Sequence, residues 1–240
     1  MNVRAVVWDV DDTLFAYTAA DRAGLWHHLR TEGLLERYGT AERALALWRE
    51  LTDVHWARFA ARETTFEGQR RDRVRAFLAA PLTDEQADVW FGRYLTHYEA
   101  AWALFPDVLP ALDALADLRH AVLSNSSAHH QERKLRALGV RDRFESLLCA
   151  AELGVAKPAA EAFHASCDAL RLPAHEVVYV GDHPEIDGAG AASAGLFSVW
   201  LDRGTWTGGV PAGPHRIASL AELPALLRGD TRFGAPSTFG

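Results

Sequence analysis

The segment RAVVWDVDDTLF, residues 4–15, is the part of the sequence that decides the fold. It starts with four apolar residues after Arg4, Ala5 to Trp8, whose length and β-branched content are typical of a strand buried on both faces. Aspartates follow where such a strand would end, and ligands bind at the carboxyl ends of the strands in an open α/β sheet. Because side chains alternate along a strand, we expect Asp9 and Asp11 to start on one face and to converge.

Two carboxylates that lie close together repel each other and tend to stay protonated. A divalent cation between them would remove that repulsion. The alternative is a strand followed by an ordinary polar turn, since Asp and Thr are common turn residues. The choice between the two depends on what the other strands of the chain carry at their ends.

The composition is that of an ordinary globular protein, with 240 residues, 26.4 kDa, 49% hydrophobic and 24% charged residues. The net charge of -7 and the pI near 5.9 argue against binding of nucleic acid or of an anionic membrane. No apolar run approaches the roughly 20 residues of a membrane helix, and Asp9, Asp11 and Asp12 interrupt the region where a signal peptide would be apolar. Cys149 and Cys167 are isolated, so we expect free thiols and a cytoplasmic location.

Lysine is rare in this chain. Of the 25 basic residues, only Lys134 and Lys157 are lysines. Arginine and lysine are not interchangeable in tight sites, so a compact ammonium is expected at one of these two positions. For Lys134 the alternative is an ordinary position on a helix surface.

Residues 16–104 are predicted to be helical throughout. Apolar residues recur with helical spacing in four stretches, and Thr65 and Thr83 stand where two of the helices would begin. Five of the eight tryptophans lie in this region, and we expect most of them in the core of a small helical bundle. The region would then be an all-helical domain inserted after the first strand.

From residue 105 onward, strands and helices alternate. Strands are predicted at 120–123, 147–150, 177–180, 197–201 and 215–217, and helices at 106–118, 128–138, 159–170, 186–194 and 220–227. This alternation predicts an α/β core with a Rossmann-like, doubly wound parallel sheet and the opening strand at its centre. Residues 1–15 and 105–228 would form that core, and 229–240 would be a loose tail.

Four of the predicted strands are followed by residues that can take part in chemistry. Asp9 and Asp11 follow the opening strand, Ser124 and Asn125 follow 120–123, Lys157 comes after 147–150, and Asp182 comes after 177–180. The carboxyl ends of parallel strands meet at one edge of a sheet. Several carboxylates, an ammonium and a hydroxyl suit a Mg²⁺ ion with a phosphoryl group, because Mg²⁺ takes hard oxygen ligands and keeps waters and phosphate oxygens as the rest. Lys157 and Ser124 would donate to the phosphate oxygens.

The order Asp-x-Asp-x-Thr, Ser-Asn, Lys-Pro, Gly-Asp-x-x-x-x-Asp resembles the haloacid dehalogenase superfamily, and specifically its aspartate-nucleophile phosphatases. The resemblance covers nearly the whole chain, to about Leu227. It implies that Asp9 is the nucleophile that forms an aspartyl-phosphate. It also implies that Asp11 is the general acid and then the base, with its backbone carbonyl on the metal, and that Thr13 steadies Asp11.

The same resemblance assigns the other motif residues to the phosphate and the metal. Ser124 and the Asn125 amide correspond to the phosphate clamp, and Lys157 to the lysine that bridges nucleophile and phosphate. Asp182 corresponds to a magnesium ligand. Asp187 corresponds to a second acidic position at the metal that would act through water.

The helical insertion resembles the cap that this family carries after its first motif. Such caps close over small substrates and supply specificity contacts. Arg70 and Arg71 are therefore candidate substrate contacts, and the alternative is a solvated, salt-bridged helix face. His183 replaces the small hydroxyl residue that the family commonly has after Asp182, and we interpret it as a loop histidine rather than a proton carrier.

Other functions on related folds make different demands on the sequence. A dehalogenase needs no Mg²⁺, and members of the family that resemble it carry a tyrosine where this chain has Asp11. In a phospho-receiver domain the lysine motif comes last, whereas Asp182 follows Lys157 here. A non-catalytic binding protein would be free to lose Asp9 and Lys157, and a phosphosugar mutase would share every core residue. We predict a Mg²⁺-dependent phosphatase, monomer or homodimer, that acts on a small phosphorylated metabolite.

Overall fold

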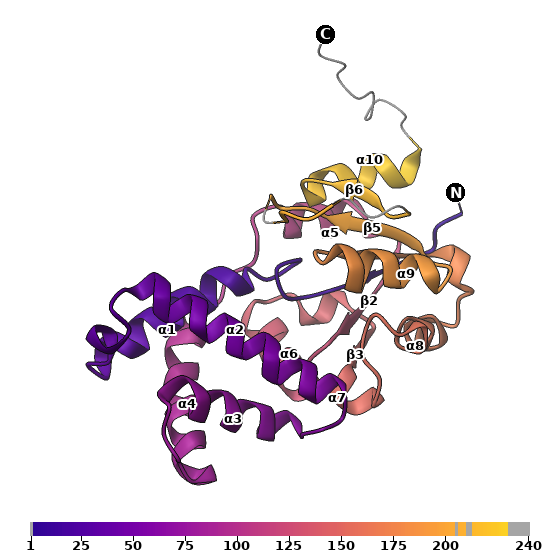
Figure 1. Cartoon of the computed structure of the whole chain (residues 1–240). Helices are drawn as coiled ribbons and strands as arrows, with labels where there is room; N and C mark the ends of the chain where they lie inside the picture. Colours follow the sequence, from indigo (N-terminus) through magenta and orange to yellow (C-terminus); the bar gives the residue numbers. More distant parts are fainter. Residues whose placement is uncertain (1, 205, 210–212, 230–240) are drawn as a thin grey trace. The chain divides into compact units, whose positions relative to one another are not determined.

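A computed structural model describes residues 2–204, 206–209 and 213–229 (Figure 1). The chain divides into two compact units. The helical unit comprises Ala16–Ala103, and the core unit comprises the segments that precede and follow it. Of the predicted tail, residues 230–240 lie outside the described residues.

The core unit contains a six-stranded sheet in the order β3-β2-β1-β4-β5-β6, with all neighbouring strands parallel. The strands are β1 (Ala5–Trp8), β2 (Arg119–Ser124), β3 (Ser146–Cys149), β4 (Val177–Gly181), β5 (Phe197–Leu201) and β6 (His215–Ile217). All four residues of β1 are buried, and β1 lies between β2 and β4. The predicted doubly wound α/β fold, with the opening strand inside the sheet, is confirmed.

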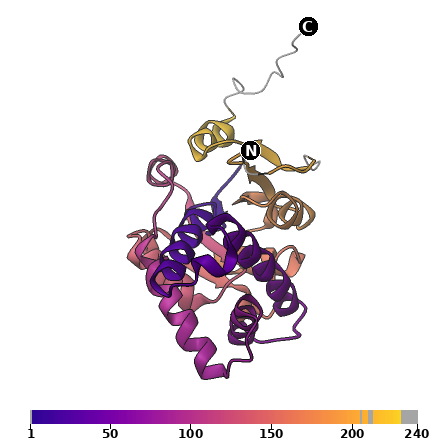
Figure 2. The ribbon, with the colours of Figure 1, turned by 60° about the vertical axis from the view of Figure 1, so that its left-hand side comes forward.

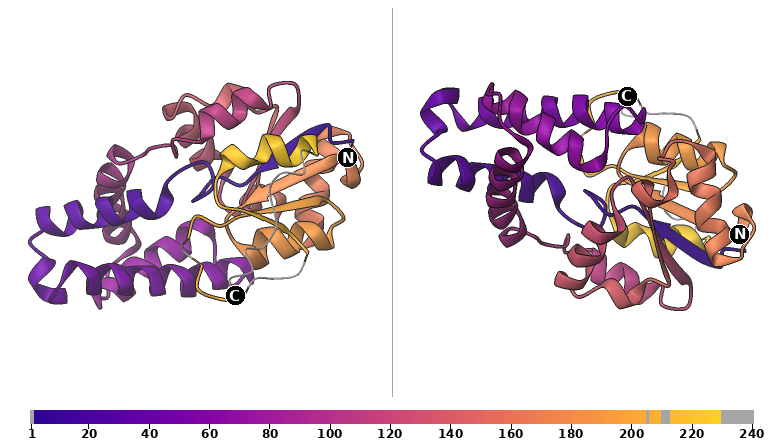
Figure 3. Two further views of the ribbon diagram at one scale, coloured as in Figure 1. Left: turned by 90° about the horizontal axis from the view of Figure 1, so that it is seen from above. Right: turned by 90° about the horizontal axis from the view of Figure 1, so that it is seen from below.

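Helices cover both faces of this sheet (Figure 3). They are α5 (Val108–Ala114), α6 (Ala128–Ala137), α7 (Ala150–Leu153), α8 (Ala160–Leu170), α9 (Gly190–Ser193) and α10 (Leu223–Arg228). Phe163 of α8 and Ala191 of α9 pack with Val7, Leu123 and Tyr179 in one buried apolar cluster. This packing fixes the strands at the edge where the predicted site residues lie.

Three helical segments of the core unit differ from the prediction. The helix predicted at 106–118 ends at Ala114, and four residues separate it from β2, which begins at Arg119. The helix predicted at 186–194 is a π-type helical turn over Pro184–Ala189 that leads into α9. It widens because the His183 carbonyl accepts hydrogen bonds from the amides of both Asp187 and Gly188. The four-residue helix α7 was too short for a periodic pattern to reveal it.

The helical unit consists mainly of α1 (Tyr17–Thr31), α2 (Ala41–Ala60), α3 (Phe66–Leu78) and α4 (Asp84–Ala100). Helix α4 packs against α1, and α3 contacts α2 and α4 (Figure 2). The hydroxyls of Thr65 and Thr83 accept hydrogen bonds from the first turns of α3 and α4, as predicted for helix-starting residues. Trp48 and Trp90 are buried in the bundle, whereas Trp26 is exposed. No helix among the described residues has both the length and the apolar character that crossing a membrane requires.

Candidate active site

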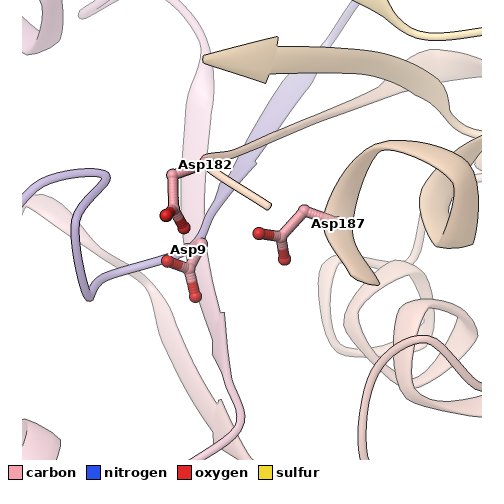
Figure 4. A group of neighbouring side chains, drawn as sticks. All are labelled: Asp9, Asp182 and Asp187. Carbon is pink, nitrogen blue, oxygen red and sulfur yellow. The ribbon is translucent and has the colours of Figure 1, made fainter. Parts of the chain in front are cut away.

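Three carboxylates meet at the carboxyl edge of the sheet (Figure 4). Asp9 follows β1, Asp182 follows β4, and Asp187 belongs to the π-type turn after β4. Each offers one oxygen, and these oxygens lie within 4.8 Å of one another. The Asp9 amide donates to the Val180 carbonyl at 2.9 Å, which extends the pairing of β1 with β4 and places Asp9 beside Asp182. The strand-end argument therefore brought together residues that lie about 170 positions apart.

Lys157 supplies the cation of this carboxylate cluster. Its Nζ donates to Asp9 Oδ1, to Asp187 Oδ1 and to the Tyr179 hydroxyl, each at 2.7 Å. The backbone of Lys157 is fixed by Asn125, whose side-chain Nδ2 donates to the Lys157 carbonyl at 2.9 Å and whose Oδ1 accepts from the Lys157 amide at 2.8 Å. Burial disfavours the ammonium, but Asp187 and Asp9 outweigh it and keep the pKa of Lys157 above its ordinary value.

Burial and mutual repulsion raise the pKa values of two carboxylates in the cluster, Asp9 and Asp182. Burial raises the pKa of Asp9 from 3.8 to about 7; Lys157 opposes this rise, and the charges of Asp187 and Asp11 add to it. Burial also raises the pKa of Asp182 well above its ordinary value, and the neighbouring charges of Asp187 and Asp9 raise it further. One ammonium is therefore too little positive charge to keep the cluster ionised.

These residues fit a divalent metal ion. The donors are carboxylate oxygens, which are the ligands that Mg²⁺ prefers. The two oxygens of Asp187 are already engaged, Oδ1 by Lys157 and Tyr179 and Oδ2 by the His183 amide at 3.0 Å. Asp9 and Asp182 are thus the better placed to bind an ion directly, and Asp187 suits contact through water.

Asp11 is directed to a different set of partners. Its Oδ1 pairs with the Lys134 ammonium, and its Oδ2 accepts from Gln131 Nε2 at 2.9 Å. Burial disfavours ionisation of Asp11, but Lys134 outweighs it and holds the pKa of Asp11 below its ordinary value. Because β1 ends at Trp8, strand alternation does not reach Asp11, and its partners on α6 orient the side chain. The convergence of Asp11 with Asp9 stays a prediction. A metal contact through the Asp11 backbone carbonyl stays a prediction.

Lys134 was the less favoured of the two lysines in the sequence, and a surface position was the alternative. The structure excludes that alternative, because the side chain of Lys134 is 1% exposed. Gln131, which lies one helical turn before Lys134 on α6, also donates to Ser124 Oγ at 2.9 Å. Ser124 is thereby connected to Asp11 through one glutamine side chain.

Thr13 lies in the turn that follows Asp11. The Val10 carbonyl accepts hydrogen bonds from the amides of Thr13, Leu14 and Phe15, which closes this turn. The buried hydroxyl of Thr13 has no hydrogen-bond partner within the described part of the chain, and the Thr13 carbonyl accepts from Arg203 Nη2 at 2.9 Å. A role of Thr13 in steadying Asp11 stays a prediction.

Gly181 is required by the close approach of Asp187. A Cβ at position 181 would lie 2.4 Å from Asp187 Cγ, far inside ordinary contact distance. Only glycine leaves room at the end of β4 for Asp187 to reach Lys157. The Gly-Asp pair of the sequence therefore has a steric cause that concerns Asp187 as much as Asp182.

His183 acts on the backbone of the turn. Its Nδ1 accepts from the amides of Glu185 at 3.3 Å and Ile186 at 3.2 Å, so the ring caps the π-type turn that carries Asp187. A Ser or Thr hydroxyl could accept the same bonds, which accounts for a histidine at a position where the family commonly has a small hydroxyl residue. His183 is therefore a loop histidine, as the sequence suggested, and its ring also stabilises the turn that carries Asp187.

The two arginines singled out in the helical unit differ in their surroundings. Arg71 forms ion pairs with Asp84 and Asp88 on the surface of that unit. Arg70 instead lies over the rings of Phe66 and Phe91, at 4.2 and 5.0 Å from their centroids. Burial lowers the pKa of Arg70 to about 10, and the nearby charge of Arg73 lowers it further. The salt-bridged alternative therefore describes Arg71 but not Arg70.

Comparison with known proteins identifies the family of the chain. Residues 3–195 match the haloacid dehalogenase-like hydrolase family. The chain belongs to that family. It is 30% identical over 253 residues to the N-acylneuraminate-9-phosphatase of Rattus norvegicus, covering 95% of this chain and 94% of the relative. The protein is therefore an enzyme of the hydrolase class.

Solved structures of haloacid dehalogenase-like proteins share this fold. The HAD-hydrolase YfnB of Bacillus subtilis, solved with bound magnesium, matches with a TM-score of 0.80 at 21% identity, over 95% of this chain and all of its own. The 2-haloacid dehalogenase of Pseudomonas syringae pv. Tomato DC3000 matches with a TM-score of 0.68 at 25% identity, over the same share of each chain. A magnesium-bound HAD-hydrolase and a 2-haloacid dehalogenase thus share this architecture, so the fold alone does not distinguish the two reactions.

Sequence reasoning missed two parts of this haloacid dehalogenase-like site. Tyr179 was interpreted only as a residue of a buried strand, yet its hydroxyl contacts both Lys157 and Asp187. Gln131 was assigned no role from the sequence, yet its side chain contacts both Asp11 and Ser124. A signal existed for Lys134, because the rarity of lysine predicted a compact ammonium at one of the two lysine positions.

Proposed function

We propose that this hydrolase is a Mg²⁺-dependent phosphatase that cleaves a small phosphomonoester through an aspartyl-phosphate on Asp9. The observation that carries the proposal is the buried group of Asp9, Asp182 and Asp187 around the Lys157 ammonium. Similarity to a phosphatase over 95% of the chain supports it. A cytoplasmic location and a monomeric or homodimeric state remain part of the proposal, and the buried free thiols of Cys149 and Cys167 suit a reducing compartment.

In the first half of the reaction, a carboxylate oxygen of Asp9 attacks phosphorus and the alcohol leaves. Lys157, at 2.7 Å from Asp9 Oδ1, is placed to bind a phosphate oxygen as well and to offset the charge that develops. The Ser124 hydroxyl and the Asn125 backbone amide are proposed to bind the other phosphate oxygens. The Asn125 side chain contributes indirectly, because it fixes the backbone that carries Lys157.

In the second half, water attacks the aspartyl-phosphate and Asp9 is released. A carboxylate nucleophile divides one difficult displacement into two easier steps. Asp11 is proposed to give a proton to the leaving oxygen and to take one from the water. The free site holds Asp11 as a carboxylate, because Lys134 lowers its pKa. The negative charge of a bound phosphate next to Asp11 would raise that pKa and favour the protonated form that the first half needs.

The carboxylates of Asp9 and Asp182 would bind Mg²⁺ directly, and Asp187 would contact it through water. The ion would supply positive charge to the phosphoryl oxygens and to the carboxylate cluster, whose crowding appears in the raised pKa values of Asp9 and Asp182. The proposed contacts of the cap with the substrate, including Arg70, belong to the same hypothesis.

The proposal is tested by release of phosphate from p-nitrophenyl phosphate, with and without Mg²⁺, for the wild type and Asp9→Asn. We expect turnover only in the wild type with Mg²⁺. Equal rates in all four reactions would contradict the proposal. A panel of sugar phosphates, nucleotides and polyol phosphates would then identify the substrate class.

Two other reactions are separated by their products. A dehalogenase would release halide from a 2-haloacid without Mg²⁺, and the acidic Asp11 with its lysine and glutamine partners argues against that chemistry. A phosphosugar mutase would return the phosphoryl group to a sugar. Isomerised sugar phosphate without free phosphate would identify that activity.

A further inference from the structure

The second lysine of the chain lies in a buried group that the proposed function leaves unexplained. Lys134 on α6 pairs with Asp11 Oδ1, and its Nζ lies 4.3 Å from the centroid of the Phe15 ring. The side chain is 1% exposed. A lysine on a helix of a soluble protein is ordinarily solvated, so this burial has to be accounted for.

Stability alone is a poor reason for such a pair. Removing an ammonium from water costs several kcal/mol, and Asp11, whose side chain is 33% exposed, stays partly hydrated. Apolar side chains of similar volume often serve a core equally well or better. An apolar residue at position 134 would pack against the Phe15 ring without that cost. The charge at this position is therefore better explained by what it does to Asp11.

Gln131 completes the arrangement. Its Nε2 donates at 2.9 Å both to Asp11 Oδ2 and to Ser124 Oγ. Lys134 and Gln131 lie three residues apart on α6, which places their side chains on the same face of the helix. Each oxygen of Asp11 thus has its own donor, and the two contacts restrict rotation of the carboxyl about the Cβ–Cγ bond.

We infer that Lys134 and Gln131 are positioning residues that hold the Asp11 carboxyl in the orientation from which it protonates the leaving oxygen, and that Gln131 couples this orientation to Ser124. The inference rests on the proposed function, because it needs a leaving alcohol. Neither residue has to touch the substrate. Their effect is exerted through Asp11, and it should depend on how much the leaving group requires a proton.

The experiment compares two phosphate esters that differ in this requirement. p-Nitrophenolate leaves readily without a proton, whereas the alkoxide from a simple alkyl phosphate does not. kcat/KM reports the steps up to loss of the alcohol, and it is measured with Mg²⁺ for the wild type, Lys134→Met and Gln131→Met. Arg136→Met is the matched control, because Arg136 lies on the same helix, is exposed and pairs with Glu132.

Loss of the Lys134 charge would raise the pKa of Asp11 and by itself favour the protonated form, but we expect the lost orientation to dominate. Lys134→Met should therefore lose on the order of 100-fold more kcat/KM on the alkyl ester than on the aryl ester, since general acid catalysis contributes at least that factor. Gln131→Met should show the same selectivity with a smaller factor, and Arg136→Met should lose nothing on either ester. Thermal unfolding of each variant shows whether it folds. If Lys134→Met does not fold, Gln131→Met carries the test.

The outcomes separate this inference from the proposed function. A wild type that hydrolyses neither ester would overturn the proposed function and this inference with it. A wild type that is active, with variants that lose equal factors on both esters or lose nothing, would overturn the inference and leave the phosphatase standing. Failure of both variants to fold would assign the group to the fold alone and would also overturn it.

Discussion

Replacing Gly181 by alanine tests the geometry of the carboxylate cluster through one methyl group. The new Cβ would lie 2.4 Å from Asp187 Cγ and 2.5 Å from Asp187 Oδ2. Carbon atoms in contact are separated by about 3.5 to 4.0 Å, so Asp187 has to move by about 1 Å or more. That movement takes Asp187 Oδ1 away from Lys157, which it contacts at 2.7 Å, and from the Tyr179 hydroxyl at 3.0 Å.

The magnitude follows from these contacts. Overpacking of a core by one methyl costs about 1–3 kcal/mol. A loss of about 2 kcal/mol lowers the Tm of a domain of this size by about 4 to 8 °C. A misplacement of about 1 Å in a catalytic group can lower the rate on the order of 100-fold. We therefore expect Gly181→Ala to lower both the Tm and the kcat for p-nitrophenyl phosphate.

The matched control is Gly92→Ala, on the exposed side of α4. Apart from the local backbone of α4, no atom of the described residues lies within 4 Å of a Cβ at position 92, so the alanine should fit and stabilise the helix by about 0.5–1 kcal/mol. Both variants are measured by urea unfolding, by thermal unfolding and by phosphate release. A Gly181→Ala enzyme with the stability and kcat of the wild type would refute the close packing of Asp187 against Gly181.

Three further changes have defined outcomes. Lys157→Met would leave buried carboxylates without their cation and should lower the free energy of unfolding in urea by about 3–5 kcal/mol at pH 8. The loss should be smaller at pH 5, because Asp9, with its pKa of about 7, is protonated there. An equal loss at both pH values would argue against the cluster. Burial lowers the pKa of His28 from 6.5 to about 4, so the unfolded chain takes up the proton first as the pH falls. The free energy of unfolding should therefore fall between pH 6.5 and pH 4, by on the order of 3 kcal/mol. His28→Phe should flatten this pH profile, and the same slope in both proteins would show that another group causes it. Gly24→Ala would place a Cβ 2.6 Å from Tyr98 Cα and should destabilise the helical unit by about 1–3 kcal/mol in thermal unfolding followed by circular dichroism, whereas an unchanged Tm would contradict the close contact of α1 with α4.

The parts of the fold that the sequence predicts well are those with a local cause. The buried strand β1 was visible because Ala5–Trp8 is a continuous apolar run, and the starts of α3 and α4 were visible because Thr65 and Thr83 cap them. The strand-end rule then placed Asp9 beside Asp182, since β1 and β4 are neighbours. Each of these predictions needs only periodicity, capping or sheet topology.

The remaining features depend on contacts between distant segments. The orientation of Asp11 follows from the early end of β1 and from two donors on α6, more than 100 residues later. The burial of Lys134 depends on how α6 packs, which helical spacing does not specify. The π-type turn before α9 arises because one carbonyl, that of His183, accepts two amides. No single-sequence pattern predicts such pairings.

Phosphorylation of Asp9 during turnover is the step on which the proposed mechanism depends. The most direct measurement is to mix the enzyme with Mg²⁺ and p-nitrophenyl phosphate, quench within milliseconds in acid, and reduce the acyl phosphate with borohydride. Peptide mass mapping then identifies the residue that was converted. We expect conversion of Asp9 to homoserine in the wild type, and no conversion when substrate is left out. Conversion at another aspartate, or rapid turnover with no residue converted, would contradict it.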